Sequence, residues 1–158
     1  MATPYRGVPI AFALLHGTPD QVGTARRWLE DTLTRTPGRI PDATTATAVL
    51  LLSETATNTL RHTPTGAPGS TFTVHVHADR HTLAVAVQDA GSTTTRPERA
   101  RTSITDDHGR GLALVEAVAD TWQPLPGGNG ISFTLSLTQA PTGTPDSASA
   151  RTAREHAR

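Results

Sequence analysis

The most informative side chains in this sequence are a carboxylate, an amide and an imidazole that follow one another at four-residue spacing. Glu54, Asn58 and His62 would share one face of a helix, because residues four apart lie above one another. No lysine or arginine stands three or four residues from Glu54, so its carboxylate must face solvent, a distant partner or a ligand. A solvated helix face is the simpler interpretation of this group taken alone.

A second group, Asp89-Ala90-Gly91, ends a segment in which apolar and polar residues alternate. An aspartate at a strand end can accept a hydrogen bond from an exocyclic amine, and a glycine lets the backbone approach a flat ring closely. The same residue types also form turns that bind nothing. Both interpretations stay open for this group by itself.

A third group, His108-Gly109-Arg110-Gly111-Leu112, opens a segment with helical spacing. Two glycines allow backbone N–H groups to surround an anion, and a helix N-terminus adds about half a positive charge there. Arg110 would add a cation. An ordinary loop is the alternative, because a glycine pair before a helix is a weak signal.

Composition excludes several kinds of site. The 158 residues contain no cysteine, which removes disulfides, thiolate nucleophiles and cysteine-ligated zinc. All 14 basic residues are arginine, so a lysine Schiff base, a Walker P-loop and a eukaryotic-type protein kinase are excluded. The 14 acidic residues balance this charge, and we therefore expect neither nucleic acid nor membrane as a partner.

The longest apolar run is too short to cross a bilayer. It covers the six residues 10–15, whereas a spanning helix needs about 20. The run also lacks the longer apolar core and the cleavage site of a secretory signal. We expect a cytoplasmic protein.

Residue spacing predicts the elements that would position the three groups. Alternation or short apolar runs indicate strands at 10–15, 72–78, 82–88 and 131–137, and three- and four-residue spacing indicates helices at about 19–36, 46–61 and 109–122. On the second helix, Ala46 and Leu50 begin the stripe that continues to Glu54, and we expect this apolar start to face the core. The order of elements predicts an α/β two-layer sandwich in which helices cover one face of a mixed sheet.

One domain is expected between two less structured ends. Residues 1–9 form an N-terminal extension, residues 10–138 form the domain, and residues 139–158 form a disordered tail in which alanine is the only apolar residue type. The polar segment 90–107 is long enough to be a functional lid.

Two further features have structural interpretations. His75 and His77 share one strand face, with His81 beyond the following turn. We interpret them as a solvated sheet face, with a metal site as the less favoured alternative. Trp28 and Trp122 are expected to fill the core.

In their order and spacing, the three groups resemble the asparagine box and the two glycine boxes of the GHKL ATPases. The asparagine box is residues 54–62, and the glycine boxes are residues 89–91 and 109–112. Within that superfamily, the small size, the Ala25-Arg26-Arg27 segment and the Gly-Arg-Gly-Leu sequence are similar to bacterial anti-sigma factor serine/threonine kinases. The resemblance covers roughly residues 10–137 and implies the Bergerat ATP-binding fold.

The resemblance also implies a role for each matching residue. Glu54 would be the catalytic base, and Asn58 would hold the Mg²⁺ that bridges the phosphates of ATP. Asp89 would recognise the adenine amino group. The remaining nucleotide-binding residues implied in this way are His62, Gly91, Gly109, Arg110, Gly111, Leu112 and Ser132, where Ser132 would supply a hydroxyl that helps to seat the adenine.

The implied activity is phosphorylation of a serine or threonine on an anti-sigma antagonist protein, by a homodimer that also sequesters a sigma factor. The alternative is a non-catalytic, ATP-dependent partner switch of the same fold. Thr93 and Asp107 favour the alternative, because they stand where the family usually has a glycine and where some kinase members have an arginine. A plain interaction domain without nucleotide is the remaining possibility.

Overall fold

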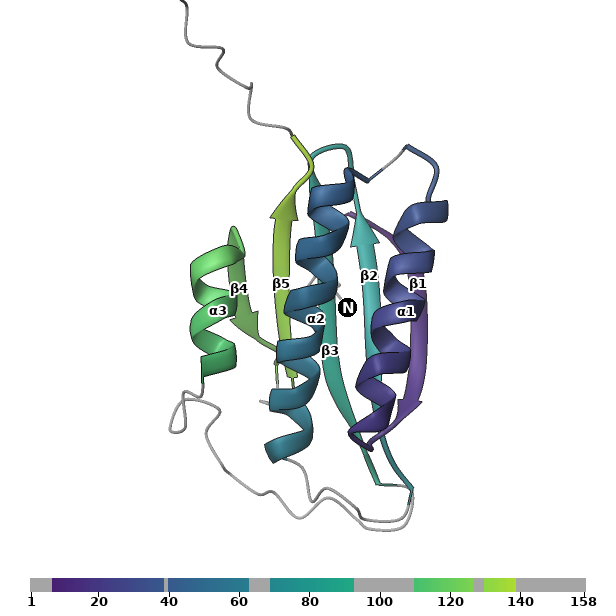
Figure 1. The fold of residues 1–158 in the computed structure, drawn as a ribbon, viewed down its shortest axis with the longest axis vertical. Helices are drawn as coiled ribbons and strands as arrows, with labels where there is room; N and C mark the ends of the chain where they lie inside the picture. Colours follow the sequence, from purple (N-terminus) through teal and green to yellow (C-terminus); the bar gives the residue numbers. More distant parts are fainter. Residues whose placement is uncertain (1–6, 39, 63–68, 93–109, 127–129, 139–158) are drawn as a thin grey trace, which may run out of the picture.

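Three helices and five strands make up the part of the chain that the structure describes, which is residues 7–38, 40–62, 69–92, 110–126 and 130–138 of a computed structural model (Figure 1). The elements in chain order are β1 (Val8–His16), α1 (Asp20–Arg35), α2 (Asp42–His62), β2 (Ser70–Ala78), β3 (Thr82–Ser92), α3 (Arg110–Val118), β4 (Thr121–Pro124) and β5 (Gly130–Ser136). The five strands form one sheet in the order β1-β2-β3-β5-β4. The predicted tail and most of the predicted lid lie outside the described residues.

All four strand pairings in this sheet are antiparallel, so the prediction of a mixed sheet is wrong. The reason is the number of elements between neighbouring strands. Two helices connect β1 to β2, and α3 and β4 connect β3 to β5. Each element runs in the direction opposite to the element before it (Figure 1). A strand that follows two intervening elements therefore runs antiparallel to the strand that precedes them.

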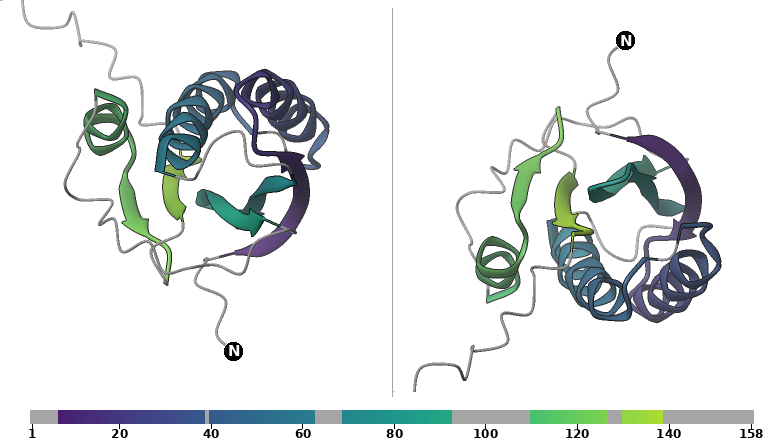
Figure 2. Two further views of the ribbon diagram at one scale, coloured as in Figure 1. Left: turned by 90° about the horizontal axis from the view of Figure 1, so that it is seen from below. Right: turned by 90° about the horizontal axis from the view of Figure 1, so that it is seen from above.

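The helices form a layer on one face of the sheet, which confirms the predicted α/β two-layer sandwich. The helix α2 contacts β3 and β5, while α1 contacts β1, and α3 lies beside α2 next to the edge strand β4 (Figure 2). The core between the layers contains Leu29 and Leu33 of α1, Leu51 and Leu52 of α2, and the alternate residues of the three central strands. Trp28 and Trp122 pack against this core, as expected.

The core-facing stripe of α2 is one position away from the predicted one. Ala46 is exposed and Leu50 is 45% exposed, so the expectation that they face the core is wrong. The apolar core positions instead follow the spacing of a core-facing helix and include Ala48, Leu51, Leu52, Ala56 and Leu60, with Thr55 and Thr59 buried beside them. Asn58, from the predicted stripe, is also buried. Thr55 and Thr59 satisfy their hydroxyls by donating to the backbone carbonyls of Leu51 and Thr55 at 2.8 and 2.9 Å, which makes them acceptable in this stripe.

Two further boundaries differ from the prediction. The helix α2 begins at Asp42, before the predicted start at residue 46, and α3 ends at Val118, before the predicted end at residue 122. Trp122 therefore lies in β4, a strand that the sequence pattern did not predict. With four residues, this strand is too short to show an alternation of its own, and its tryptophan is placed by pairing with Phe133 of β5.

The opposite face of the sheet is not covered by the helices (Figure 2). Its residues include His75 and His77 of β2 and Ala84 and Ala86 of β3, as the register requires. His77 is only 6% exposed, so the prediction of a solvated face is wrong at this position. Across the described residues, no group of three or more His, Asp or Glu side chains could hold a metal ion.

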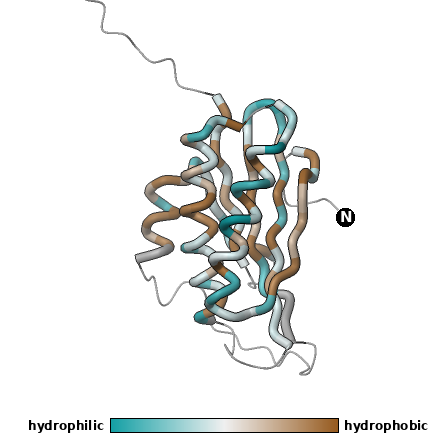
Figure 3. The backbone as a smooth tube through the Cα atoms, turned by 45° about the vertical axis from the view of Figure 1, so that its right-hand side comes forward, coloured by the Kyte–Doolittle hydropathy of each residue, from teal (hydrophilic) through white to brown (hydrophobic). Residues whose placement is uncertain are grey.

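Hydrophilic and hydrophobic residues are interspersed along each helix (Figure 3). None of the helices within the described ranges is long and apolar enough to cross a membrane.

Candidate functional site

The last turns of α2 carry the carboxylate and the amide that the sequence singled out. Asn58 is 9% exposed, and Glu54, one turn earlier, is partly exposed. Because they are four residues apart, their side chains lie on the same side of the helix. His62 is the last residue of α2, and its backbone therefore continues the same row.

Asp89 lies on the face of the sheet that α2 covers. It follows Leu83, Val85 and Val87 at two-residue steps along β3, and these three side chains belong to the core between the layers. Its partner on β2 is the buried Phe72. A row of apolar side chains therefore ends in a partly exposed carboxylate.

A β-bulge follows immediately after Asp89. The register pairs Phe72 with Asp89 and Thr71 with Gly91, so Ala90 is the extra residue on β3. A bulge changes the direction of a strand and the way in which its next residues point, and bulges are common beside active sites. The backbone of Gly91 is still paired with β2, which fixes its position relative to Asp89.

The second glycine box lies at the beginning of α3. Arg110 and Gly111 are the first two residues of this helix, and Leu112 is 2% exposed. The contacts of α3 are with α2 and β4. Gly109 lies outside the described residues.

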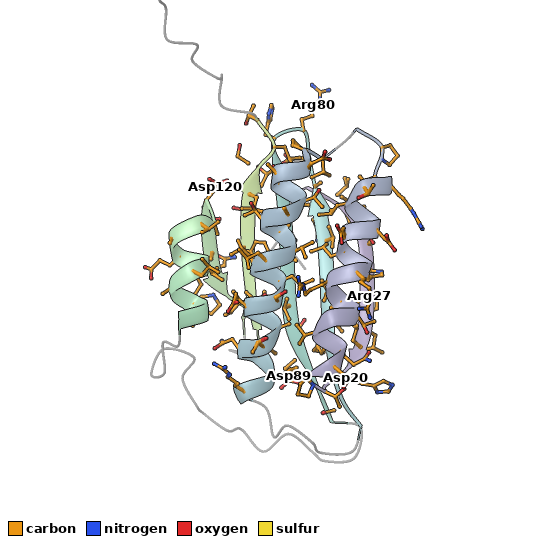
Figure 4. All side chains as sticks on the ribbon, in the orientation of Figure 1. Asp20, Arg27, Arg80, Asp89 and Asp120 are labelled. Carbon is orange, nitrogen blue, oxygen red and sulfur yellow. The ribbon has the colours of Figure 1, made fainter. Side chains whose placement is uncertain are left out.

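The three groups converge on one end of the molecule. The C-terminal end of α2, the C-terminal end of β3 and the N-terminal end of α3 all lie at the lower end of the view in Figure 1. Asp89 is labelled there in Figure 4, beside the last turn of α2. Three segments that are far apart in the sequence therefore bring an amide, two carboxylates and a helix N-terminus to one end of the sandwich.

The start of β5 approaches this end from the neighbouring strand. A Cβ atom on Gly130 would lie 2.2 Å from the carbonyl oxygen of Val87 and 2.8 Å from Cδ1 of Leu125. Only glycine fits at this distance, so Gly130 lets β5 begin directly beside the end of β3. The pairing of Val87 with Ile131 then places Ile131 on the same face as Asp89.

Ser132 does not join this group. It pairs with Ala86, and both residues point away from α2, because their neighbours Val85, Val87 and Phe133 fill the core. The sheet itself separates Ser132 from Asp89, and we therefore leave it out of the proposed site. Sequence analysis missed Ile131, although the two-residue period from Phe133 would have placed it on the correct face.

The side chains at this end suit a nucleotide with Mg²⁺. Magnesium prefers oxygen ligands and is often held by one or two protein oxygens together with substrate phosphates rather than by a complete protein cage. Asn58 offers an amide oxygen, and Glu54 and Asp89 offer carboxylates.

A helix-covered antiparallel sheet with polar groups gathered at one end of its central strands defines a small ligand-binding α/β protein. Residues 15–135, which are more than half of the chain, match the histidine kinase-like ATPase domain, and the chain belongs to this family. The comparison with curated proteins gives no match. Membership of the family confirms the GHKL superfamily expected from the three boxes and implies that the protein binds ATP.

Proposed function

We propose that this protein is an ATP- and Mg²⁺-dependent serine/threonine kinase of the anti-sigma factor type. It would phosphorylate an anti-sigma antagonist and sequester a sigma factor. The observation that carries the proposal is the common location of the ends of α2, β3 and α3 (Figure 1). These are the elements that bear the asparagine box and the two glycine boxes.

The residues at this end have complementary roles in the proposal. Asp89 accepts a hydrogen bond from the adenine amino group, while Ile131 and Val87 provide an apolar floor on the same face. Asn58 and the phosphates hold Mg²⁺, which supplies charge neutralisation. The N–H groups at the start of α3 bind phosphate oxygens, because a helix N-terminus favours anions.

Glu54 acts on the acceptor in the proposed reaction. Its carboxylate takes the proton of the acceptor hydroxyl as the hydroxyl oxygen bonds to the γ-phosphorus. The bond from that phosphorus to the bridging oxygen breaks, and ADP leaves with the electron pair. The products are ADP, a phosphoserine or phosphothreonine and a protonated Glu54.

The kinase proposal is tested with Glu54→Gln, which keeps the size of the side chain and removes the base. We expect phosphate transfer from γ-labelled ATP to an antagonist recovered by pull-down to fall at least about a hundredfold, the usual contribution of a general base. The dissociation constant for ATP should change little. Wild-type protein that binds ATP but labels no antagonist contradicts the kinase proposal.

That outcome would favour the non-catalytic partner switch, in which ATP stabilises a conformation that a partner recognises. In that case Glu54→Gln should capture the partner in the same ATP-dependent pull-down as well as the wild type does. The observation favouring this alternative remains the presence of Thr93 and Asp107 in the sequence.

We also propose that the protein is a homodimer and that the uncovered face of the sheet is its interface. Phe12 and Leu14 of β1 are 57% and 60% exposed, and the register aligns them with His75 and Thr73 on this face. The described strand residues of this face include no Asp, Glu, Lys or Arg. Two copies of a neutral face can meet without repulsion between like charges.

A further inference from the structure

The short connection between α3 and β4 contains a side chain that ties it to the next strand. Only Ala119 and Asp120 separate the two elements. The carboxylate of Asp120 accepts a hydrogen bond from the backbone N–H of Ser136, and the N–H of Asp120 donates to the carbonyl oxygen of Thr134 at 3.0 Å. One residue therefore bonds twice to β5.

Two neighbouring contacts extend this link. The hydroxyls of Thr121 and Thr134 are hydrogen-bonded at 2.6 Å, and the N–H of Ala119 donates to the carbonyl oxygen of Val115 at 2.9 Å, which continues the hydrogen bonding of α3 beyond its last residue. The C-terminal end of α3 is thus bonded, through Asp120, to the strand that runs beside β3.

Apolar packing holds one side of α3 against the rest of the protein. Leu112 and Val115 are buried and Leu114 is partly buried, while the exposed residues are Ala113, Glu116, Ala117 and Val118. The main contacts of the helix are with α2 and with the short edge strand β4. Packing on one side of a short helix resists its separation from α2 but allows the helix to tilt.

A small tilt would matter at the other end of α3. Asp120 lies toward the end of the molecule opposite Asp89 (Figure 4). The helix has nine residues and is therefore about 13 Å long, so a rotation of about 5° around its C-terminal end would move its N-terminal end by about 1 Å. A displacement of this size is enough to impair the binding of a charged group that must meet several N–H groups at once.

We propose that Asp120 is a positioning residue for the nucleotide site. It fixes α3 to β5, and through α3 it holds the phosphate-binding glycine box in place. This inference rests on the proposed function, because it assumes that phosphates of ATP bind at the start of α3. It concerns a side chain that lies away from the nucleotide and outside all three boxes.

The experiment compares Asp120→Ala with a matched control, Asp79→Ala. Asp79 is also an exposed acid whose carboxylate accepts backbone hydrogen bonds, from the N–H groups of His81 at 2.7 Å and Thr82 at 2.8 Å, but it caps the β2–β3 hairpin. Both variants lose a link of similar kind. The dissociation constant for Mg²⁺-ATP is measured at a temperature at which every variant is folded by circular dichroism.

We expect Asp120→Ala to weaken ATP binding about tenfold and Asp79→Ala to weaken it less than about twofold. Asp120→Asn should keep near-wild-type affinity, because its amide oxygen can still accept from Ser136. Equal affinities for wild type and Asp120→Ala, or equal weakening by both alanine variants, would overturn the inference and leave the proposed function intact.

Hydrogen exchange provides a measurement that does not depend on ATP. Peptides covering α3 should exchange faster in Asp120→Ala than in wild type, while peptides from α1 should not change. Unchanged exchange in α3 would also overturn the inference. A wild-type protein that binds no ATP would instead contradict the proposed function, and the exchange measurement would still decide whether Asp120 holds α3.

Discussion

The two faces of the sheet are built from alternate residues of the same strands, yet they differ in size, polarity and cover. On the covered face, Val85 and Phe133 lie opposite each other beneath α2. On the other face, the corresponding pairs are Ala86 with Ser132 and Ala86 with His75. Large apolar side chains pack against the helices, whereas the central strands place small or weakly polar side chains on the other face.

This difference separates two kinds of function. The residues proposed to bind ATP, such as Asn58 and Asp89, belong to the covered face or to the helices above it. The residues proposed to contact a second copy, such as Phe12 and Leu14, belong to the uncovered face. A substitution on one face should therefore leave the property of the other face largely unchanged.

The largest expected effect is the loss of ATP binding in Asn58→Ala. For the wild type, Mg²⁺-ATP at about 100 times its dissociation constant should stabilise the fold by about 2.7 kcal/mol. This increase should raise the melting temperature, and it should disappear in Asn58→Ala, because the amide oxygen proposed to hold Mg²⁺ is removed. Differential scanning fluorimetry with and without Mg²⁺-ATP measures both shifts.

Ser132→Ala is the control for this experiment, since Ser132 lies on the other face. Its ATP-induced shift should equal that of the wild type. Loss of the shift in Ser132→Ala would mean that the division between the faces is wrong for the nucleotide site. The melting temperature without ATP shows whether either variant is destabilised by itself.

A second prediction concerns association through the uncovered face. Phe12→Asp should weaken dimerisation at least about a hundredfold, because a two-fold interface would bury two unpaired carboxylates, each costing several kcal/mol. Sedimentation equilibrium gives the dissociation constant of the dimer. Phe12→Leu should stay dimeric, and the ATP-induced shift in melting temperature should persist in both variants. A wild type that is monomeric at high concentration contradicts the proposed interface.

The smallest expected effect is a pH dependence of stability that arises from the uncovered face. Desolvation lowers the pKa of His75 and of His77 below the usual value of 6.5, and the charge of His75 lowers the pKa of His77 further. The strand neighbours facing the two imidazoles are Phe12, Ala84, Ala86 and Pro9, none of them charged. Burial therefore favours the neutral form of both imidazoles.

The direction of this pH dependence follows from the number of protons bound to the folded and to the unfolded chain. Below about pH 6.5 the unfolded chain binds protons at these histidines before the folded chain does, so stability is complete above this pH and is lost as the pH falls. Each histidine contributes at most about 1.4 kcal/mol per pH unit. Urea denaturation between pH 7.5 and 5 should show this slope, and His77→Gln should reduce it. An equal slope in His77→Gln would exclude His77 as its source.

Much of the fold was predictable from local patterns. The spacing of Val22, Ala25 or Arg26, Leu29 and Leu33 predicts a helix at α1. Ala25, Leu29 and Leu33 are completely buried, and Val22 packs against the core. The alternation in 72–78 and 82–88 predicts a hairpin, which β2 and β3 form. These predictions succeed because a helix or a hairpin is specified mainly by neighbours in the sequence.

The errors arose where contacts between residues far apart in the sequence determine the local structure. The buried side of α2 could not be read from Ala46 and Leu50, since alanine, leucine and threonine occur on several sides of this helix. Trp122 fitted a helical period but lies in β4, because pairing with β5 outweighs the local pattern. Ser132 was predicted from the resemblance, as the source of a hydroxyl near the adenine, and the register of β5 places it on the other face.

The sequence by itself determined the chemical groups of the candidate site, their order along the chain and the superfamily to which they belong. Tertiary structure decided which groups lie together, which face of the sheet each occupies, and that Asp120 ties α3 to β5. The physical reason is that residue types and spacings fix what a segment can form and bind, whereas strand register and helix packing depend on contacts between segments far apart in the chain.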